Sequence, residues 1–184
     1  MSQNLEYIAD TSAGAIRDLG VARALLDDIR NGTRGPTLRI YQPQPTVAFG
    51  ARDRFADGFP QATQAARAHG FTPALRTLGG RAAAYHLGSL VLDHLEPAST
   101  LYGKTQERFT QFGELYASAL RTLGVDWDPQ TGGALSELHP GITVEDVKDA
   151  FLAAYATEWD IRETALTSEV IEASRAYDER HRVE

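Results

Sequence analysis

Two arginines flank a pair of glycines in the segment 75–86, and this spacing is typical of a turn that binds an anion. The guanidinium groups of Arg76 and Arg81 can hold a phosphate or a carboxylate through paired hydrogen bonds. Gly79 and Gly80 carry no side chain, so their amide groups can approach a ligand closely and donate further hydrogen bonds. The segment alone fits equally well a hairpin turn with two solvated arginines.

The other residue types exclude several kinds of site. The chain has no cysteine, which rules out disulfides, thiolate nucleophiles and cysteine-bound zinc. Its histidines are scattered without the spacing of metal ligands, so no metal site built by the protein is predicted. Ser89 lies in an extended run and not in a strand-to-helix elbow, which argues against a serine hydrolase.

Length and charge narrow the class of protein further. A chain of 184 residues fits one compact domain, which we expect to span residues 1–184. The 18 basic and 25 acidic residues give a formal charge of -7, so nucleic-acid binding is not expected. No apolar run approaches the roughly 18 residues needed to span a membrane. The sequence therefore predicts a soluble protein, and the lack of cysteine fits a cytoplasmic location.

The elements that must position the turn follow from the periodicity of the sequence. Apolar residues spaced by three and four between Ile16 and Ile29 predict a helix that ends at the following Asn-Gly pair. Residues 38–41 and 46–50 predict two short strands separated by a proline-bracketed bend. A short helix is predicted over residues 61–69, and the glycine at position 70 ends it.

The second half of the chain reads as one strand followed mainly by helices. A continuous strand is predicted from Tyr85 to His94. An apolar stripe from Phe109 to Leu123 predicts a long helix that ends at the next glycine, and Thr143 with Asp146 predicts the capped start of another. A last helix is expected near Ser168. Because strands and helices do not alternate regularly, an α+β fold is predicted.

Two segments, and the distance between them, resemble the lipoate-protein ligase and octanoyltransferase family. Residues 38–50 (LRIYQPQPTVAFG) look like the early strand pair of this family, and residues 76–88 look like its turn and following strand. The long helix ending at Gly124 and the closing helices over about 143–184 are also similar. The resemblance implies a mixed, largely antiparallel sheet flanked by helices, as in the biotin and lipoate ligases, with a reduced number of strands.

The resemblance also implies a function. A protein of this family binds lipoate or octanoate, or its adenylate, for attachment to a lysine of a lipoyl-carrier domain, and uses ATP with Mg²⁺. By this likeness, the early strand pair helps to form the acyl pocket. Arg76, Gly79, Gly80 and Arg81 then border the carboxylate and the adenylate phosphate, and His86 is a further candidate ligand.

The middle of the chain departs from the family pattern. Family members continue after the long helix through several strands with a lysine in a glycine-flanked GxKxxG-like pattern. Here residues 124–140 lead directly to the closing helices, and Lys104 and Lys148, which are the two lysines of the chain, lie outside any such pattern. The catalytic residue is therefore unassigned, and a noncatalytic acyl-binding or interaction subunit is the alternative function. The missing strands predict an open sheet edge, and hence a homodimer or a partner subunit.

Overall fold

The computed structural model describes residues 3–77, 80–97, 105–126 and 134–184. The chain divides into two compact units. One unit combines Met1–Glu6 with Pro97–Arg162, and the other combines Tyr7–Glu96 with Glu163–Glu184. The single domain expected over residues 1–184 stays a prediction.

The described residues contain two sheets flanked by helices, and the smaller sheet mixes parallel and antiparallel pairs, which confirms the predicted α+β class. The larger sheet has the order β6-β2-β1-β7 and the smaller has the order β4-β3-β5. Strand β2 pairs antiparallel with β6, whereas β3 pairs parallel with β4 and antiparallel with β5. The strands are β1 (Gln3–Thr11), β2 (Thr37–Gln42), β3 (Thr46–Phe49), β4 (Thr72–Leu75), β5 (Ala83–Tyr85), β6 (Val91–Leu95) and β7 (Trp159–Thr164).

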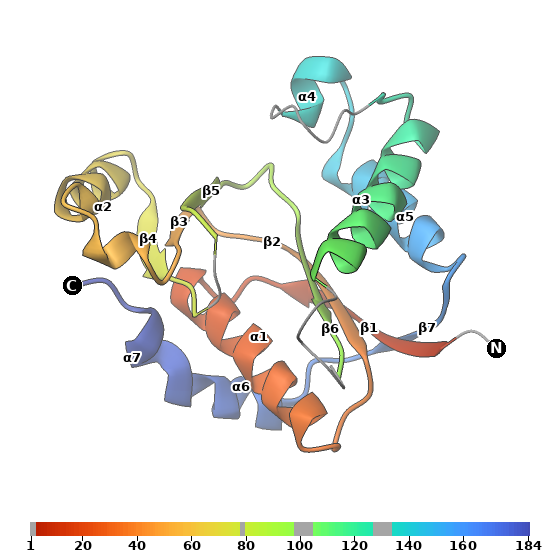
Figure 1. The fold of residues 1–184 in the computed structure, drawn as a ribbon, viewed down its shortest axis with the longest axis horizontal. Helices are drawn as coiled ribbons and strands as arrows, with labels where there is room; N and C mark the ends of the chain where they lie inside the picture. Colours follow the sequence, from red (N-terminus) through yellow and green to blue (C-terminus); the bar gives the residue numbers. More distant parts are fainter. Residues whose placement is uncertain (1–2, 78–79, 98–104, 127–133) are drawn as a thin grey trace. The chain divides into compact units, whose positions relative to one another are not determined.

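In the second unit, α1 (Ala15–Arg30) and α6 (Ser168–Ser174) pack side by side (Figure 1). A Cβ atom at Gly20 would lie 2.7 Å from the carbonyl oxygen of Ser174, so the helix backbones approach closely at this glycine. Val21 of α1 and Val170 of α6 belong to one buried apolar cluster. Both helices begin close to the residues predicted for them.

Short helices complete this unit. The 3-10 helix η1 (Asp53–Phe55) follows β3, and α2 (Phe59–Ala68) lies before β4, in agreement with the helix predicted over residues 61–69. After α6 the chain forms the 3-10 helix η2 (Arg175–Tyr177) and then α7 (Asp178–His181). These last elements are tied to α1 by an ion pair of 2.6 Å between Arg17 and Asp178.

In the first unit, α3 (Thr105–Thr122) packs against α5 (Val144–Tyr155) through aromatic side chains (Figure 1). Tyr116 of α3 contacts Phe151 of α5 with ring centroids 5.0 Å apart. The predicted ends are confirmed: Gly124 has a φ of 76°, which favours glycine, and Thr143 caps α5 by accepting a hydrogen bond from the amide of Asp146.

The continuous strand predicted over Tyr85–His94 is wrong. The structure divides it into β5 and β6, which belong to different sheets. The interruption is a turn in which the amide of Ser89 donates to the carbonyl of His86, while the hydroxyl of Ser89 accepts from the amide of His86. These bonds use backbone groups that a continuous strand would place in a ladder.

The described residues of the middle segment contain the short helix α4 (Leu135–Leu138) and no strand between Gly124 and Pro140. Lys148 lies on α5, where it forms an ion pair with Glu145, and Lys104 lies outside the described residues. Across the described ranges, none of the helices has the length and apolar composition of a membrane span.

Candidate functional site

The candidate anion-binding segment crosses the carboxyl end of β3. Strands β4 and β5 lie on opposite sides of β3, so the chain leaves β4 at one edge and returns in β5 at the other. The register pairs Phe49 with Leu75 on one side and Ala48 with Ala83 on the other. The segment is therefore a crossover above the end of a central strand, and the hairpin interpretation is wrong. We call residues 76–81 the Arg76–Arg81 turn; Gly79 and its neighbour Leu78 lie outside the described residues.

Arg76 holds this turn from within. Its amide donates to the carbonyl of Phe49 at 2.7 Å, and its Nη2 donates to the carbonyl of Arg81 at 2.5 Å. A Cβ atom at Gly80 would lie 3.2 Å from this Nη2, and Gly80 has a φ of 100°, which favours glycine. The Nε of Arg76 is buried and has no hydrogen-bond partner among the described residues. Arg76 thus stabilises the shape of the turn, and its Nε remains as a donor without a hydrogen bond among the described residues.

Arg81 presents its charge to solvent. Its side chain is 95% exposed, and its Nη1 lies 4.0 Å from the Oδ1 of Asp53. The other carboxylate oxygen of Asp53 accepts a hydrogen bond of 2.8 Å from the amide of Gly50. A Cβ atom at Gly50 would lie 2.0 Å from the carbonyl oxygen of Gly80, so the two segments are in direct backbone contact. Asp53 fixes the loop that supports the turn, leaving the donors of Arg81 available to a ligand.

Sequence reasoning missed the contribution of residues 50–55. Arg52 and Arg54 are exposed on this segment, beside Phe55, whose side chain is 74% exposed. The guanidinium of Arg54 lies 4.5 Å from the centre of the Phe55 ring. Together with the Arg76–Arg81 turn, this segment collects positive charge in a chain of net charge -7. The signal in the sequence was Asp53 itself, four residues beyond the end of β3, because the carboxylate of an Asp in a turn commonly accepts a hydrogen bond from the backbone.

His86 lies apart from the Arg76–Arg81 turn. It follows Tyr85, which pairs with Thr46 at the opposite end of β3, so up to about 16 Å of extended chain separates it from Arg81. The Nδ1 of His86 accepts a hydrogen bond of 2.9 Å from the amide of Gly88. A neutral ring therefore carries its proton on Nε2, which remains as the donor available to a ligand.

A buried ion cluster joins the larger sheet to α1. The side chain of Arg39 is fully buried and pairs with Asp10 at 2.7 Å, Asp18 at 3.1 Å and Asp93 at 3.2 Å. Its guanidinium lies 3.9 Å from the centre of the Tyr41 ring. Burial raises the pKa of Asp93, and Arg39 opposes this shift. One arginine thus joins carboxylates from β1, α1 and β6, and this network could not be read from the spacing of the sequence.

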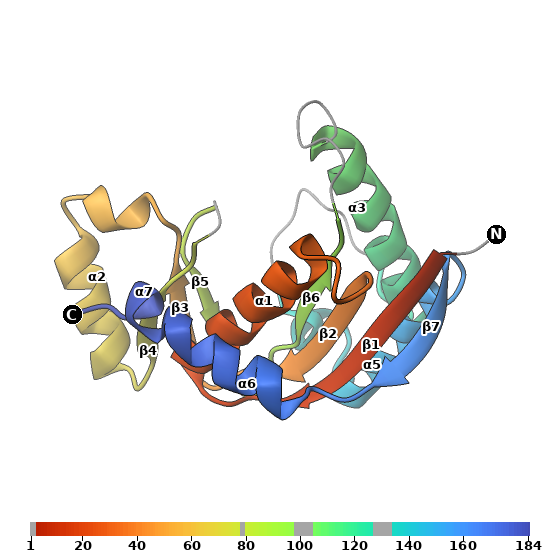
Figure 2. The ribbon, with the colours of Figure 1, turned by 90° about the horizontal axis from the view of Figure 1, so that it is seen from below.

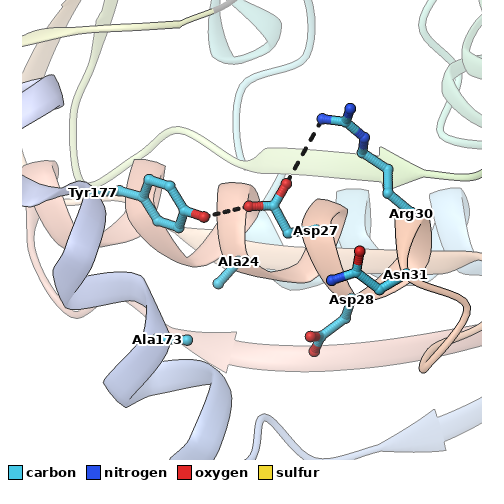
Figure 3. Close-up of a pocket in the computed structure, with 7 residues that line it drawn as sticks. All are labelled: Ala24, Asp27, Asp28, Arg30, Asn31, Ala173 and Tyr177. Atoms are coloured by element: carbon cyan, nitrogen blue, oxygen red, sulfur yellow. Dashed lines mark hydrogen bonds and ion pairs between the residues drawn. The ribbon is translucent and has the colours of Figure 1, made fainter.

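A surface pocket of about 620 Å³ lies between α1 and the end of α6 with η2 (Figure 3). Figure 3 shows Asp27 between Tyr177 and Arg30: the Tyr177 hydroxyl donates to Asp27, and Arg30 lies 3.8 Å from it. Arg23 also pairs with Asp27 at 3.2 Å. Because the charges of this pocket already compensate one another, the Arg76–Arg81 turn is the better candidate site. Across the described residues, no group of three histidine or acidic side chains is placed to hold a metal ion.

Comparison with known proteins gives a family match. A protein-family model described as the lipoyl protein ligase A/B catalytic domain matches residues 16–152. This range includes β2, β3 and the Arg76–Arg81 turn. None of the curated proteins matches the sequence.

Several solved structures share the fold. The T. acidophilum protein Ta0514 with bound lipoic acid is 16% identical, with a TM-score of 0.76 over 98% of this chain and 96% of that one. A lipoate-protein ligase A bound with ATP is 15% identical, with a TM-score of 0.74 over 97% and 95% of the two chains. The bi-partite lipoate protein ligase of Thermoplasma acidophilum, studied with its E2 lipoyl domain, is 16% identical, with a TM-score of 0.72 over 97% and 92%.

Proposed function

Because the chain belongs to the lipoyl protein ligase A/B catalytic-domain family, we propose that it binds lipoate or octanoate, or the corresponding adenylate, for attachment to a carrier-domain lysine. The observation that carries the proposal is the exposed guanidinium of Arg81 on a turn held by Arg76, within the matched range. The bound lipoic acid and ATP of the similar structures support the same ligand classes.

In this proposal the Arg76–Arg81 turn binds the anionic part of the ligand. Arg81 offers paired donors to the carboxylate or to the adenylate phosphate, and the buried Nε of Arg76 offers one more. Gly79 and Gly80 contribute amide donors. The ATP cofactor brings Mg²⁺ with it, since this ion is commonly bound by phosphates and only one or two carboxylates, and Asp53 is the carboxylate next to Arg81.

The acyl chain extends away from this anionic end. The early strand pair, residues 38–50, lines the acyl pocket, and His86 donates from Nε2 to a part of the ligand distant from Arg81. The separation of His86 from the turn along β3 supports this division, because a single small anion would not contact both.

The second ligand is a protein. A lipoyl-carrier domain is the proposed acceptor, supported by the E2 lipoyl domain of the bi-partite ligase. Strand β6 lies at the edge of its sheet in the part that the structure describes, and its side chains are only partly buried. An edge of this kind can pair with another chain, so we also propose a homodimer or a partner subunit. A cytoplasmic location completes the proposal.

The position of the lysines bears on whether the chain catalyses the ligase reaction. Lys148 lies on a helix and pairs with Glu145, and the described residues between Gly124 and Pro140 form no lysine-bearing strand. This observation is the basis of the second candidate function, a noncatalytic acyl-binding or interaction subunit of the same fold. The family match and the bound lipoic acid and ATP of the similar structures favour the ligase-type function over it. The two candidates share the ligand and differ only in chemistry.

Calorimetry on the full chain tests the proposal. We would titrate lipoate, octanoate, ATP and a nonhydrolysable lipoyl-adenylate analogue, and measure pyrophosphate release with the natural substrates. Binding of the analogue supports the proposed ligand class, and pyrophosphate release then selects the enzyme over the noncatalytic subunit. Failure of all four compounds to bind would overturn the proposed function.

A further inference from the structure

His181 connects the end of α7 to the strand from which the anion-binding turn leaves. The residue is only 1% exposed, and its Nδ1 lies 2.7 Å from the carbonyl oxygen of Leu75. Leu75 is the last residue of β4 and directly precedes Arg76. Figure 2 shows α7 beside β4. A buried side chain from residue 181 therefore contacts the backbone at the base of the turn.

Two neighbouring contacts attach the same segment to the same part of the fold. Arg182 forms an isolated antiparallel bridge with Ala74 of β4. Arg67, near the end of α2, donates a hydrogen bond of 2.8 Å from Nη2 to the carbonyl of Val183. Because β3 occupies the other side of β4, residues 181–183 cover the side of β4 that would otherwise be an open edge.

The chemistry of this contact defines the state of the ring. A carbonyl oxygen accepts hydrogen bonds, so Nδ1 carries the proton and Nε2 of the neutral ring does not. Nε2 is buried without a hydrogen-bond partner in the described part of the chain. Burial lowers the pKa of His181, against the effect of its bond to Leu75 and of Asp178, while Arg180 and Arg23 add to the lowering. The ring therefore acts as a neutral donor.

We propose that His181 is a positioning residue for the Arg76–Arg81 turn. By binding the Leu75 carbonyl, it fixes the last peptide of β4 and hence the direction in which Arg76 leaves the strand. Arg76 then spans the turn to the carbonyl of Arg81. The order of action is His181, Leu75, Arg76 and the exposed Arg81, so a residue outside the turn sets the geometry of its donors. The ligand part of this inference rests on the proposed function.

Two substitutions separate the hydrogen bond from the volume of the ring. His181→Leu keeps a side chain of comparable size but removes the donor, whereas His181→Asn places an amide N–H donor close to the position of Nδ1. In the full chain, hydrogen exchange of peptides covering residues 75–82 should rise about fivefold to tenfold for His181→Leu, the effect expected from losing one buried hydrogen bond. The dissociation constant for the lipoyl-adenylate analogue should rise by a similar factor. His181→Asn should restore both toward wild type.

Val170→Ala is the matched control for a general loss of stability. Val170 packs in the apolar cluster between α1 and α6 and has no part in the contact with Leu75. It should raise exchange in α1 and α6 and leave residues 75–82 close to wild type. Unchanged exchange of residues 75–82 in His181→Leu, or an equal rise in Val170→Ala, would overturn the inference. If the wild-type chain does not bind the analogue, the proposed function fails, and the exchange measurement still decides the role of His181.

Discussion

Arg81 and Arg76 have the same charge but different roles. Arg81 is almost fully exposed, with its nearest carboxylate at 4.0 Å, whereas Arg76 folds back into the turn and binds the Arg81 carbonyl. A ligand gains new hydrogen bonds from Arg81 without breaking internal ones. Arg76 contributes mainly by keeping the turn in shape. The two arginines should therefore respond differently to substitution.

Arg81→Ala should weaken binding of the lipoyl-adenylate analogue by about 1.5 to 3 kcal/mol, the range for a hydrogen bond to a charged group. Its free energy of unfolding should stay close to wild type, because an exposed side chain of this kind contributes little to stability. Calorimetry and urea denaturation measure the two effects. Arg162→Ala, which removes an exposed ion pair with Asp160, serves as the control. Equal affinity of the Arg81 variant and wild type would remove this residue from the site.

Arg39→Ala should destabilise the protein by about 3 to 5 kcal/mol, because it leaves buried carboxylates without their cation. The affected groups are Asp10, Asp18 and Asp93, all within 3.2 Å of the guanidinium. Arg175→Ala removes an exposed pair with Glu172 and should change the free energy of unfolding by less than about 1 kcal/mol. Urea denaturation of both variants provides the measurement. A similar small effect at Arg39 would contradict the structural role of the cluster.

His181 predicts a pH dependence of stability. Its folded-state pKa is lowered below the ordinary 6.5, so the unfolded chain takes up a proton before the folded chain does. The stabilising contribution is complete above pH 6.5 and is lost as the pH falls toward the folded-state pKa. The free energy of unfolding of wild type should therefore decrease between about pH 7 and pH 5.5 more steeply than that of His181→Asn, whose amide does not titrate. If the free energies of unfolding of the two proteins changed in parallel with pH, the titration of His181 would not contribute to the pH dependence of stability.

Among the elements, the contact between the loop after β3 and the turn after β4 is the tightest packing around the site. Gly50→Ala would place a Cβ atom 2.0 Å from the Gly80 carbonyl, so one of the two segments must move. We expect destabilisation by about 1 to 3 kcal/mol, as for overpacked interiors, together with weaker analogue binding. Gly113→Ala in α3 meets no atom within 4 Å and should leave binding unchanged. Urea denaturation measures the stability and calorimetry measures the binding. If Gly50→Ala matched wild type in both measurements, the contact between the two segments would be disproved.

The elements also differ in how far the sequence predicts them. The helices α1, α3 and α5 were predictable because apolar residues recur at helical spacing between identifiable ends. Strands β1 and β7 were missed. In β1, Leu5 and Tyr7 alternate with Glu6, but the polar residues around them leave the alternation of apolar and polar positions too short to indicate a strand. The division of Tyr85–His94 between two sheets depends on side-chain bonds of His86 and Ser89 that a hydrophobic pattern does not contain.

The candidate site was predictable only in part for a similar reason. Arg76, Gly80 and Arg81 are close in sequence, so the turn that unites them is a local feature. His181 reaches the same region through a tertiary contact and carries no local signal of that role. For Asp53 the sequence shows only its place in a turn, and not its proximity to Arg81. The separation of His86 from the turn follows from strand register, which is fixed by pairing with β3 and cannot be read from the segment itself.

For the whole molecule, binding and turnover should separate. If adenylation needs a strand-borne lysine near the transferring phosphate, the chain should bind ligand and release pyrophosphate very slowly. A graft of a lysine-bearing family segment in place of residues 124–140 should then accelerate release by about a hundredfold or more, as expected for one preorganised charge-stabilising group. A graft with alanine in place of that lysine is the control. Rapid adenylation by the unmodified chain would show that Arg76, Arg81 or Lys104 supplies the charge.

The contact between Leu75 and His181 joins residues that are 106 positions apart in the chain. During synthesis the turn and its supporting strands leave the ribosome long before their positioning residue exists. At about 5 to 20 residues per second, this interval lasts roughly 5 to 20 seconds. In that time β4 has the edge that residues 181–183 later cover, so the growing chain passes through a stage in which this edge can pair with another strand. Completion of the candidate anion site is thereby coupled to a step of folding that requires residue 181.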